Sequence, residues 1–131
     1  DYFENLKQAH KAILEGAFQT ALARATSATD ERPNDSIAHT YRGIALHGIS
    51  RFRQAVDAFN IADAIDPDNP AIMFNRGLSN LAHSRPSDAV SDFSSALSLD
   101  SSFGAALKYR AVAYDHLGMT IEAEADRKMS K

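Results

Sequence analysis

The sequence predicts an all-α fold, an array of four helical hairpins that stack in a row. The first observation is an internal repeat: when Ser36–Asn69 is shifted by 34 residues in either direction, small residues, aromatics and prolines return at the same offsets. The second observation is that each copy contains two short helical patterns joined by a turn. A period of this length built from two helices is typical of stacked hairpin arrays.

The period divides the 131-residue chain into four repeats, which we expect to form one domain over residues 1–131. No low-complexity segment or long linker interrupts the series. The four repeats are Tyr2–Asp35, Ser36–Asn69, Pro70–Phe103 and Gly104–Lys131.

Small residues recur where the two helices of a hairpin must approach each other closely. The eighth position of the repeat holds Ala9, Gly43, Gly77 and Ala111, and the twentieth holds Ala21, Ala55, Ala89 and Ala123. Helices pack closely only where side chains are small, so we expect these residues to lie between the helices. At the twenty-fourth position, Phe59 and Phe93 are expected to fill the gap to the next hairpin.

Turn and capping residues set the expected helix boundaries. In the first repeat we expect helices over residues 2–14 and 18–29. Gly16 and Gly118 are expected to stop the first helix of their repeats in a left-handed conformation. Pro70 is expected at the first position of a helix. The expected N-terminal caps are Asp35 or Ser36, Ser50, Asn69, Ser101 or Ser102, and Thr120.

This skeleton resembles the tetratricopeptide repeat family over essentially the whole chain. Three of the four repeats place arginine just before the small residue of the eighth position, which resembles a bacterial-style variant of the repeat. The residues at this seventh position are Gln8, Arg42, Arg76 and Arg110. The resemblance implies a right-handed superhelical solenoid of four hairpins. It also implies that the first helix of each repeat lines a concave groove that binds peptides or partner proteins.

By this resemblance, the residues that contact a partner lie on the first helix of each repeat. Their apolar and aromatic character is typical of a contact site, and it favours an amphipathic helix or an extended peptide with apolar anchors. Phe74 and Tyr109 are the expected anchors. The alternative, that some of these side chains only pack the first helices against their neighbours, stays open. The candidate binding residues are Tyr41, Ile44, Phe74, Asn75, Leu78, Tyr109 and Val112.

Two kinds of anion binding, a carboxylate clamp and an anion-binding track of arginines, can be examined at equivalent positions of the repeats. Chaperone-binding members of the family hold a C-terminal carboxylate with Lys, Arg and Asn side chains, and here only Asn75 matches. Because the cations are missing, we predict no carboxylate clamp for chaperone tails. The arginines at the seventh position could form an anion-binding track or pair with carboxylates such as Asp57 or Asp92, and we favour pairing.

Composition and motifs disfavour several other function classes. The chain has 17 acidic and 14 basic residues, and a net charge of −3 disfavours nucleic-acid binding. No apolar run is long enough for a membrane span, and cysteine is absent. The histidines near helix ends point in different directions, and no phosphate loop or nucleophile motif appears. We therefore predict no metal site, no cofactor and no enzyme activity. These histidines are His47, His83 and His116.

The terminal repeats differ from the middle ones. Arg127 and Ser130 stand where phenylalanine and alanine stand earlier, and polar residues there predict that the array ends. Tyr2 and Phe3 open the first repeat with apolar surface, so self-assembly into a homo-oligomer is an alternative function. A third is a regulatory appendage of a larger enzyme. The chain opens at Asp1, which we interpret as a piece of a longer protein; the compartment stays open, with the cytoplasm slightly favoured.

Overall fold

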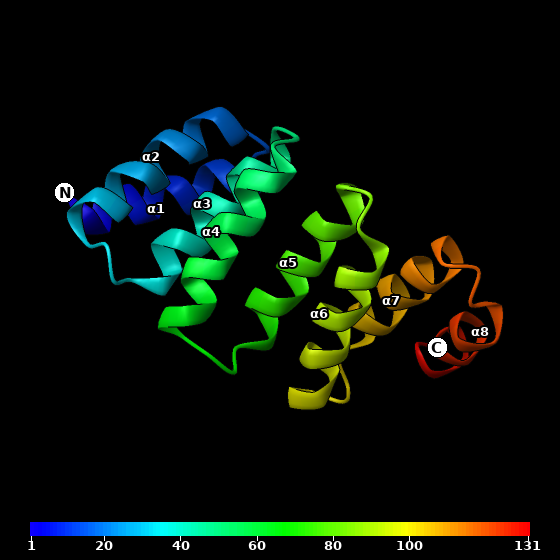
Figure 1. Cartoon of the computed structure of the whole chain (residues 1–131). Helices are drawn as coiled ribbons and strands as arrows, with labels where there is room; N and C mark the ends of the chain where they lie inside the picture. The colour runs from blue at the N-terminus through cyan, green and yellow to red at the C-terminus, as the bar shows by residue number, and fades with distance from the viewer. The chain divides into compact units, whose positions relative to one another are not determined.

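The protein is all-α, as predicted. A computed structural model describes residues 1–131, and it contains eight helices and no strand. Figure 1 shows the helices in chain order. Their bounds are α1 Tyr2–Leu14, α2 Phe18–Glu31, α3 Ser36–Gly48, α4 Phe52–Ile65, α5 Pro70–Ala82, α6 Pro86–Leu99, α7 Gly104–His116 and α8 Thr120–Met129.

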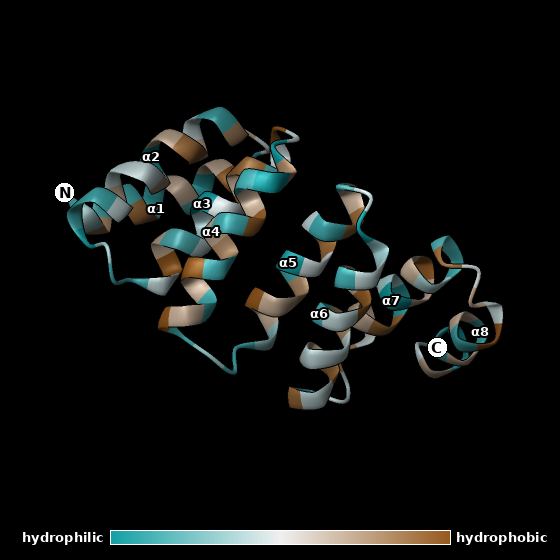
Figure 2. Cartoon of the chain, viewed as in Figure 1, coloured by the Kyte–Doolittle hydropathy of each residue, from teal (hydrophilic) through white to brown (hydrophobic).

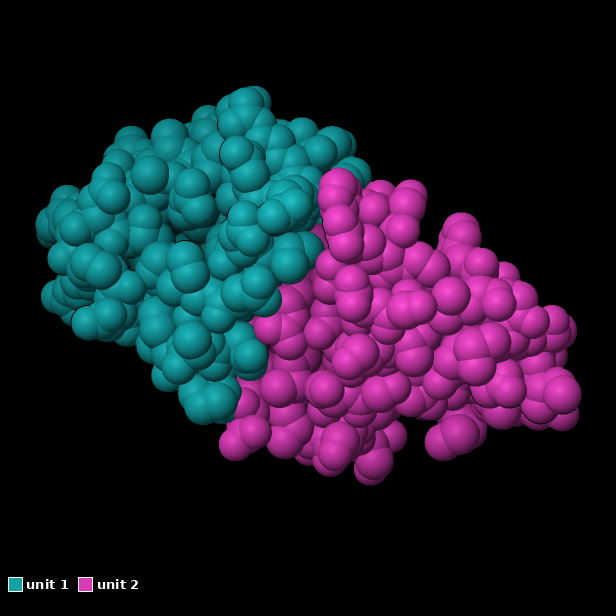
Figure 3. Space-filling model, viewed as in Figure 1, with its two compact units in different colours: residues 1–67 teal, residues 68–131 magenta.

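The helices form two compact units, residues 1–67 and residues 68–131 (Figure 3). The first unit contains the hairpins α1–α2 and α3–α4, and the second contains α5–α6 and α7–α8. Within each unit, the second helix of one hairpin packs against the first helix of the next, α2 on α3 and α6 on α7. The expectation of one domain over residues 1–131 stays a prediction.

Figure 2 shows hydrophobic and hydrophilic residues interspersed along the helices of both units, for example along α4, α5 and α6. This pattern is typical of helices that bury one face and expose the other. None of the eight helices combines the length and the apolar character needed to cross a membrane.

Each hairpin closes over its small residues. The alanines of the twentieth position are fully buried in all four hairpins. A Cβ added to Gly43 would come within 2.5 Å of the Phe59 ring, and one added to Gly77 within 2.6 Å of the Phe93 ring. Real Cβ atoms do not approach this closely, so both glycines are required by the ring that covers them. The phenylalanines therefore fill space inside their own hairpin, and Phe93 also packs against alanines of the following helix α7.

The turn inside every hairpin contains a residue with positive φ. Gly16 and Gly118 both have φ of 73°, which confirms the left-handed turn predicted for them. Ser50 and Ser84 occupy the same point of their hairpins with φ of 64° and 59°. The prediction that Ser50 caps α4 is therefore wrong: Ser50 closes the turn, and the N-terminal cap is Arg51, whose side chain makes no capping bond.

Two of the other predicted caps are confirmed. The Asp35 carboxylate accepts a hydrogen bond from the backbone N–H of Ile37 at 2.8 Å, and α3 begins at the next residue, Ser36. The Asn69 side-chain oxygen accepts from the N–H of Ala71 at 3.0 Å, with Pro70 at the start of α5 as expected. These short polar side chains satisfy backbone donors that have no partner inside the helix.

The caps predicted for the last hairpin are wrong. The N-terminal cap of α7 is Phe103, not a residue of 101–102, because Ser102 donates its N–H and hydroxyl to the Asp100 carboxylate instead. Thr120 is the first residue inside α8, and Met119 precedes it without a side-chain bond. Serine and threonine bond to nearby backbone and side-chain groups in several ways, so their presence near a helix start does not settle which one caps it.

Candidate functional site

In the first unit, α1 and α3 present one continuous surface. The rings of His10 and Tyr41 stack with centroids 5.7 Å apart and an interplanar angle of 8°, so these side chains share a face. Residues spaced by four, seven and eleven along a helix lie on one side of it. We call the resulting surface the first inner face; it comprises Phe3, Lys7, His10 and Leu14 of α1 with Ile37, Tyr41 and Ile44 of α3.

The first inner face leaves large apolar side chains in solvent. Phe3 is 66% exposed, Leu14 74% and Ile37 51%, while Tyr41 and Ile44 are half-buried. Side chains of this size gathered on one face favour a contact surface, because a monomer gains nothing from leaving them in water. The predicted residues Tyr41 and Ile44 belong to this surface, and Tyr41 contacts α1 through His10.

In the second unit, the predicted residues lie on α5 and α7, and Phe74 is tied into the core. Its ring lies 4.9 Å from that of Phe103, 5.7 Å from that of Phe93 and 6.0 Å from that of Tyr109. The structure therefore brings Phe74 and Tyr109 together, as an anchor pair requires. It also gives Phe74 the packing role that the alternative interpretation allowed. We call these five residues the second inner face: Phe74, Asn75, Leu78, Tyr109 and Val112.

All five residues of the second inner face are half-buried. The side-chain amide of Asn75 donates to the carbonyl of Ala71 in its own helix at 2.9 Å. Leu78 and Tyr109 pack against the cluster around Phe93. The second inner face therefore exposes less apolar surface than the first, because its large side chains also pack into the core.

The arginines of the seventh position pair with groups inside the fold. Arg76 Nε donates to Asp92 at 2.9 Å, which confirms the predicted pairing for that residue. Arg110 donates two hydrogen bonds to the Asp126 carboxylate, each 2.7 Å long, and a third to the hydroxyl of Ser94 at 3.1 Å. Two bonds between the planar guanidinium and one carboxylate are the strongest arrangement for such a pair.

Arg42 differs, and the suggested pairing with Asp57 is wrong. Its Nε donates to the Thr26 hydroxyl at 3.3 Å, and Asp57 is exposed. The reason lies in the spacing: the acidic partner stands 16 residues after Arg76 and after Arg110, whereas Ala58 stands 16 residues after Arg42. This constant spacing was the signal that sequence reasoning missed.

Burial and hydrogen bonding shift three side chains in these regions. Burial raises the pKa of Asp92, although Arg76 and Asn80 both stabilise its charged form. The hydrogen bond to Asp126 raises the pKa of Arg110. Burial lowers the pKa of His47, whose ring meets the Phe52 ring edge-on at 5.1 Å. These shifts belong to groups held inside the hairpins.

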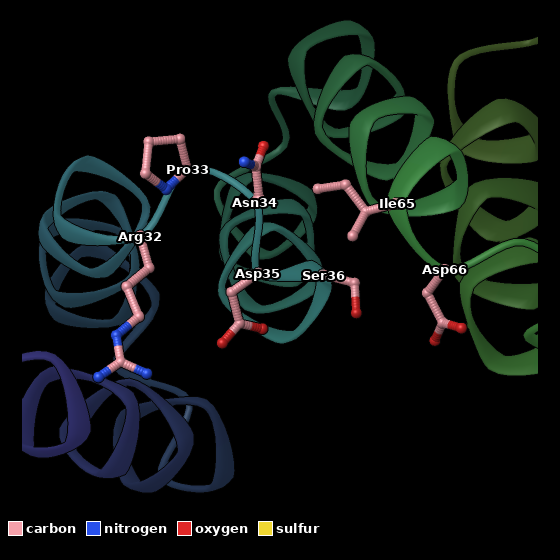
Figure 4. Close-up of a pocket in the computed structure, with 7 residues that line it drawn as sticks. All are labelled: Arg32, Pro33, Asn34, Asp35, Ser36, Ile65 and Asp66. Carbon is pink, nitrogen blue, oxygen red and sulfur yellow. The ribbon is translucent and has the colours of Figure 1, made fainter.

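One pocket of the first unit lies between the α2–α3 connection and the end of α4. It has a volume of about 650 Å³ and is lined by Arg32, Pro33, Asn34, Asp35, Ser36, Ile65 and Asp66. Figure 4 shows Arg32 extending away from Ile65 toward α1, where its guanidinium lies 4.2 Å from the centre of the Tyr2 ring and 4.7 Å from that of Phe3. The Asp35 carboxylate of this pocket is already engaged, because it caps α3.

The surface of α8 that corresponds to the packed surface of α6 is hydrophilic. On α6, Val90, Phe93 and Leu97 pack toward α7. The same positions of the last repeat are Glu124 and Arg127, which lie in α8, and Lys131, which lies beyond its end. Arg127 pairs with Asp115 and, at 2.7 Å, with Glu124. Of the two polar residues predicted to solvate this surface, Arg127 is held in ion pairs and Ser130 donates its hydroxyl to the Arg127 carbonyl at 2.9 Å. The predicted end of the array stays a prediction.

Residues 6–70 match the family model described as tetratricopeptide repeat, and the 34-residue period continues the pattern to the end of the chain. The chain belongs to the tetratricopeptide repeat family. The sequence-based assignment is thereby confirmed, together with the all-α fold of helical hairpins.

Similar curated proteins contain the same kind of repeat within much longer chains. One is the DnaJ homolog subfamily C member 7 homolog of Schizosaccharomyces pombe, 37% identical over 89 residues, which cover 65% of this chain and 19% of that protein. Another is human tetratricopeptide repeat protein 28, 27% identical over 100 residues, which cover 76% of this chain and 4% of that protein. The chain thus spans only a small part of these relatives.

Solved structures of tetratricopeptide repeat proteins are similar to it in fold. The crystal structure of MamA superimposes with a TM-score of 0.92 at 19% identity, covering 99% of this chain and 76% of that one. The first tetratricopeptide domain of human RPAP3 gives 0.85 at 19% identity, covering 91% and 94%. The second such domain of Spaghetti (RPAP3), solved with the HSP90 peptide SRMEEVD, gives 0.71 at 25% identity, covering 73% and 89%.

Proposed function

We propose that this chain is a non-catalytic scaffold that binds a peptide or a partner helix on the inner faces of its first-position helices. The observation that carries the proposal is the first inner face, where Phe3, Leu14 and Ile37 remain exposed beside the stacked His10 and Tyr41 rings. Aromatic and large apolar side chains supply most of the energy at protein interfaces. The Spaghetti domain, which was solved with a bound peptide, supports the same class of function.

The contact residues proposed in the first unit are Tyr41 and Ile44. In the second unit the anchors proposed are Phe74 and Tyr109, with Asn75, Leu78 and Val112 beside them. Support for the second set is weaker in one respect, because the Phe74 ring also holds the unit together. A binding test on Phe74 therefore needs the conservative change Phe74→Leu as well as the truncation to alanine.

The partner proposed has apolar anchors and needs no terminal carboxylate. By the family's pattern, a carboxylate clamp would require cations at the positions occupied by Thr40, Ala105 and Tyr109, and an asparagine at that of Ile44. Asn75 alone could contribute, and its amide is bonded to Ala71. A buried carboxylate without a cationic partner is strongly disfavoured, so chaperone tails are not the ligand that we propose.

Groups that could suggest catalysis are engaged in other contacts. Asp115 is adjacent to His116 in sequence but pairs with Arg127. Ser94 accepts a hydrogen bond from Arg110 and has no base beside it in the hydrogen-bond network. The proposal therefore assigns no catalytic residue.

The proposal is tested by selecting peptides that bind the full chain from a displayed library. We expect the selected peptides to lose at least about tenfold in affinity with Tyr41→Ala combined with Ile44→Ala, since interface anchors typically contribute this much or more. The matched control is Gln19→Ala on the exposed side of α2. Circular dichroism checks that all variants remain helical. Selected peptides whose affinity is unchanged by every inner-face substitution would contradict the proposal.

A second candidate function, self-assembly through the terminal hairpins, is favoured by α8. Ile121 is 82% exposed and Met129 67%, and both lie on one side of this helix. The same positions of α6 hold Ser87 and Ser95. Sedimentation at two concentrations tests the idea: association that disappears with Ile121→Ser and Met129→Ser would support it, and a monomer at high concentration would eliminate it. A regulatory role within a larger enzyme remains a third proposal.

A further inference from the structure

We propose that the first inner face binds an acidic amphipathic helix, one whose apolar side chains meet Phe3, Leu14 and Ile37 while its carboxylates meet the surrounding cations. This inference rests on the proposed function and specifies the partner class for one of its two faces. It follows from the distribution of charge in the first unit, from the contacts of the individual cations, and from the length of the face.

In the first unit, the first helices of the hairpins, α1 and α3, differ in charge from the second helices, α2 and α4. Glu4 is the only acidic residue in α1 and α3, although the whole chain has a net charge of −3. The basic residues of these helices are Lys7, Lys11 and Arg42, and the histidines are His10, His39 and His47. The second helices, α2 and α4, contain more acidic than basic residues. The acidic ones are Asp30, Glu31, Asp57 and Asp63, and the basic ones are Arg24 and Arg53.

The lysines of α1 remain available to a partner. Lys7 and Lys11 are exposed, and neither forms an ion pair. Arg42, by contrast, is directed toward α2, where it bonds to Thr26. Glu4 lies one turn before Lys7, but its carboxylate accepts a hydrogen bond from Gln8 at 2.9 Å, which is the main reason that its pKa is lowered.

A third cation, Arg32, lies at the opposite end of the face from Leu14. Its guanidinium is held over the rings of Tyr2 and Phe3 and not by a carboxylate. Arginine bound to an aromatic face keeps its edge N–H groups free to donate to a ligand. The carboxylate nearest in sequence, Glu31, accepts a hydrogen bond from the Asn5 side-chain amide at 2.7 Å, and Asp35 accepts the backbone N–H of Ile37. Cations therefore flank the apolar residues both at this end and along the middle of α1.

The dimensions of the face suit a short helix. Phe3 and Leu14 are 11 residues apart on α1, so they are separated by about 16 Å, or three helical turns. An apolar stripe of that length binds the apolar stripe of a helix of similar length. Because three cations without an ion-pair partner lie beside the stripe and the Glu4 carboxylate is bonded to Gln8, electrostatic complementarity favours a partner with acidic flanks over one with basic flanks.

The second inner face lacks this combination. Its exposed cation is Lys108, which lies 5.7 Å from the centre of the Tyr109 ring. No large apolar side chain of α5 or α7 is among the exposed ones. The acidic-helix inference is therefore confined to the first unit.

Three synthetic peptides test the inference on the full chain. Each has about 15 residues, enough for four helical turns, with acetylated and amidated ends and the same Leu and Phe stripe. They differ in the remaining residues, which are mainly Glu, mainly Gln or mainly Lys. By fluorescence anisotropy we expect the Glu peptide to bind about tenfold more tightly than the Gln peptide, the Lys peptide to bind least, and the difference to shrink at high salt.

Paired variants locate the effect. Lys7→Glu with Lys11→Glu should weaken the Glu peptide by about tenfold and leave the Gln peptide within about twofold. The control pair, Lys128→Glu with Lys131→Glu, changes the net charge equally at the end of the second unit and should leave both affinities unchanged. A Gln peptide that binds as tightly as the Glu peptide, or a control pair as harmful as the α1 pair, would overturn the inference.

The outcome for the proposed function is separate. Tyr41→Ala with Ile44→Ala should weaken all three peptides, because these residues contact the common apolar stripe. If the peptides bind without charge preference but depend on Tyr41 and Ile44, the charge inference fails and the inner-face proposal stands. If none binds, or if binding ignores Tyr41 and Ile44, both fail for the first unit.

Discussion

The two units of this protein are built from the same repeat but use its variable positions differently. In the second unit, the arginines Arg76 and Arg110 pair with buried carboxylates, and the Phe74 ring joins an aromatic cluster. In the first unit, Arg42 has only a hydroxyl partner, and the large apolar side chains of α1 and α3 remain in solvent. The first helices of the hairpins thus contribute to the core in the second unit and expose apolar side chains in the first.

The largest difference in stability that we expect between the two units concerns their aromatic residues. Phe74→Ala should destabilise the protein by about 3 kcal/mol, because the ring packs against three other aromatic rings. Tyr41→Ala should cost about 1 kcal/mol, since the ring lies on the surface against His10 alone among the aromatics. Urea unfolding followed by helical circular dichroism measures both. Equal losses would show that the two inner faces are equally structural.

The next largest effect distinguishes the contributions of two ion pairs, Arg110–Asp126 and Arg76–Asp92, to stability. Asp126→Asn should destabilise by about 2 kcal/mol, because Arg110 loses both bonds to a charged acceptor. Asp92→Asn should cost about half as much, about 1 kcal/mol, since Asn80 can remain bonded and burial already disfavours the charge. The measurement is again urea unfolding at neutral pH. A larger loss for Asp92→Asn would contradict the ranking.

Both units have the same positive-φ residue in their hairpin turns, and we expect glycine substitutions there to increase stability. Ser50→Gly and Ser84→Gly should each stabilise by about 1 kcal/mol, because glycine adopts positive φ without the steric cost that a Cβ brings. Gly16→Ala is the reciprocal control and should destabilise by a similar amount, although its added Cβ would meet no neighbour within 4 Å. Thermal unfolding detects all three. A neutral result at both serines would show that these turns relax.

The smallest effect is an opposite response of the two units to acid. The folded-state pKa of His47 lies below its ordinary value of 6.5, so its contribution to stability is present above that pH and declines as the pH falls below it. The folded-state pKa of Asp92 lies above 3.8, so its contribution is present below that pH and is lost as the pH rises through the folded pKa. His47→Gln should therefore flatten the stability profile below pH 6.5, and Asp92→Asn should flatten it in the more acidic range.

Much of the fold could be predicted because it depends on a few obligatory residues. Buried alanines of the twentieth position and glycines beneath Phe59 and Phe93 leave little choice of packing, so the period was sufficient to place the eight helices. The predicted helix over residues 2–14 matches α1, and the one over 18–29 ends two residues before α2 does. Caps were less predictable, because Ser50 can equally close a turn.

The candidate site could be predicted only in outline. Helical periodicity places Tyr41 and Tyr109 on first-position helices, but it does not say how deeply a neighbouring ring is buried. Phe74 is drawn inward by Phe93 and Phe103, which come from other helices or loops and whose distances no spacing rule supplies. Leu14 was missed because it comes at the end of α1, where sequence alone does not separate an exposed leucine from a packed one.

The most direct test of the central claim, that the free surface of the first unit is the binding site, is a ¹H–¹⁵N NMR titration of the full chain with the Glu peptide. Binding at the first inner face should concentrate the shifted amides on α1 and α3, around Lys7, His10 and Tyr41, while α4 and α8 remain unchanged. Shifts concentrated on the outer helices α2 and α4, or around the pocket at Asn34 and Asp66, would contradict it.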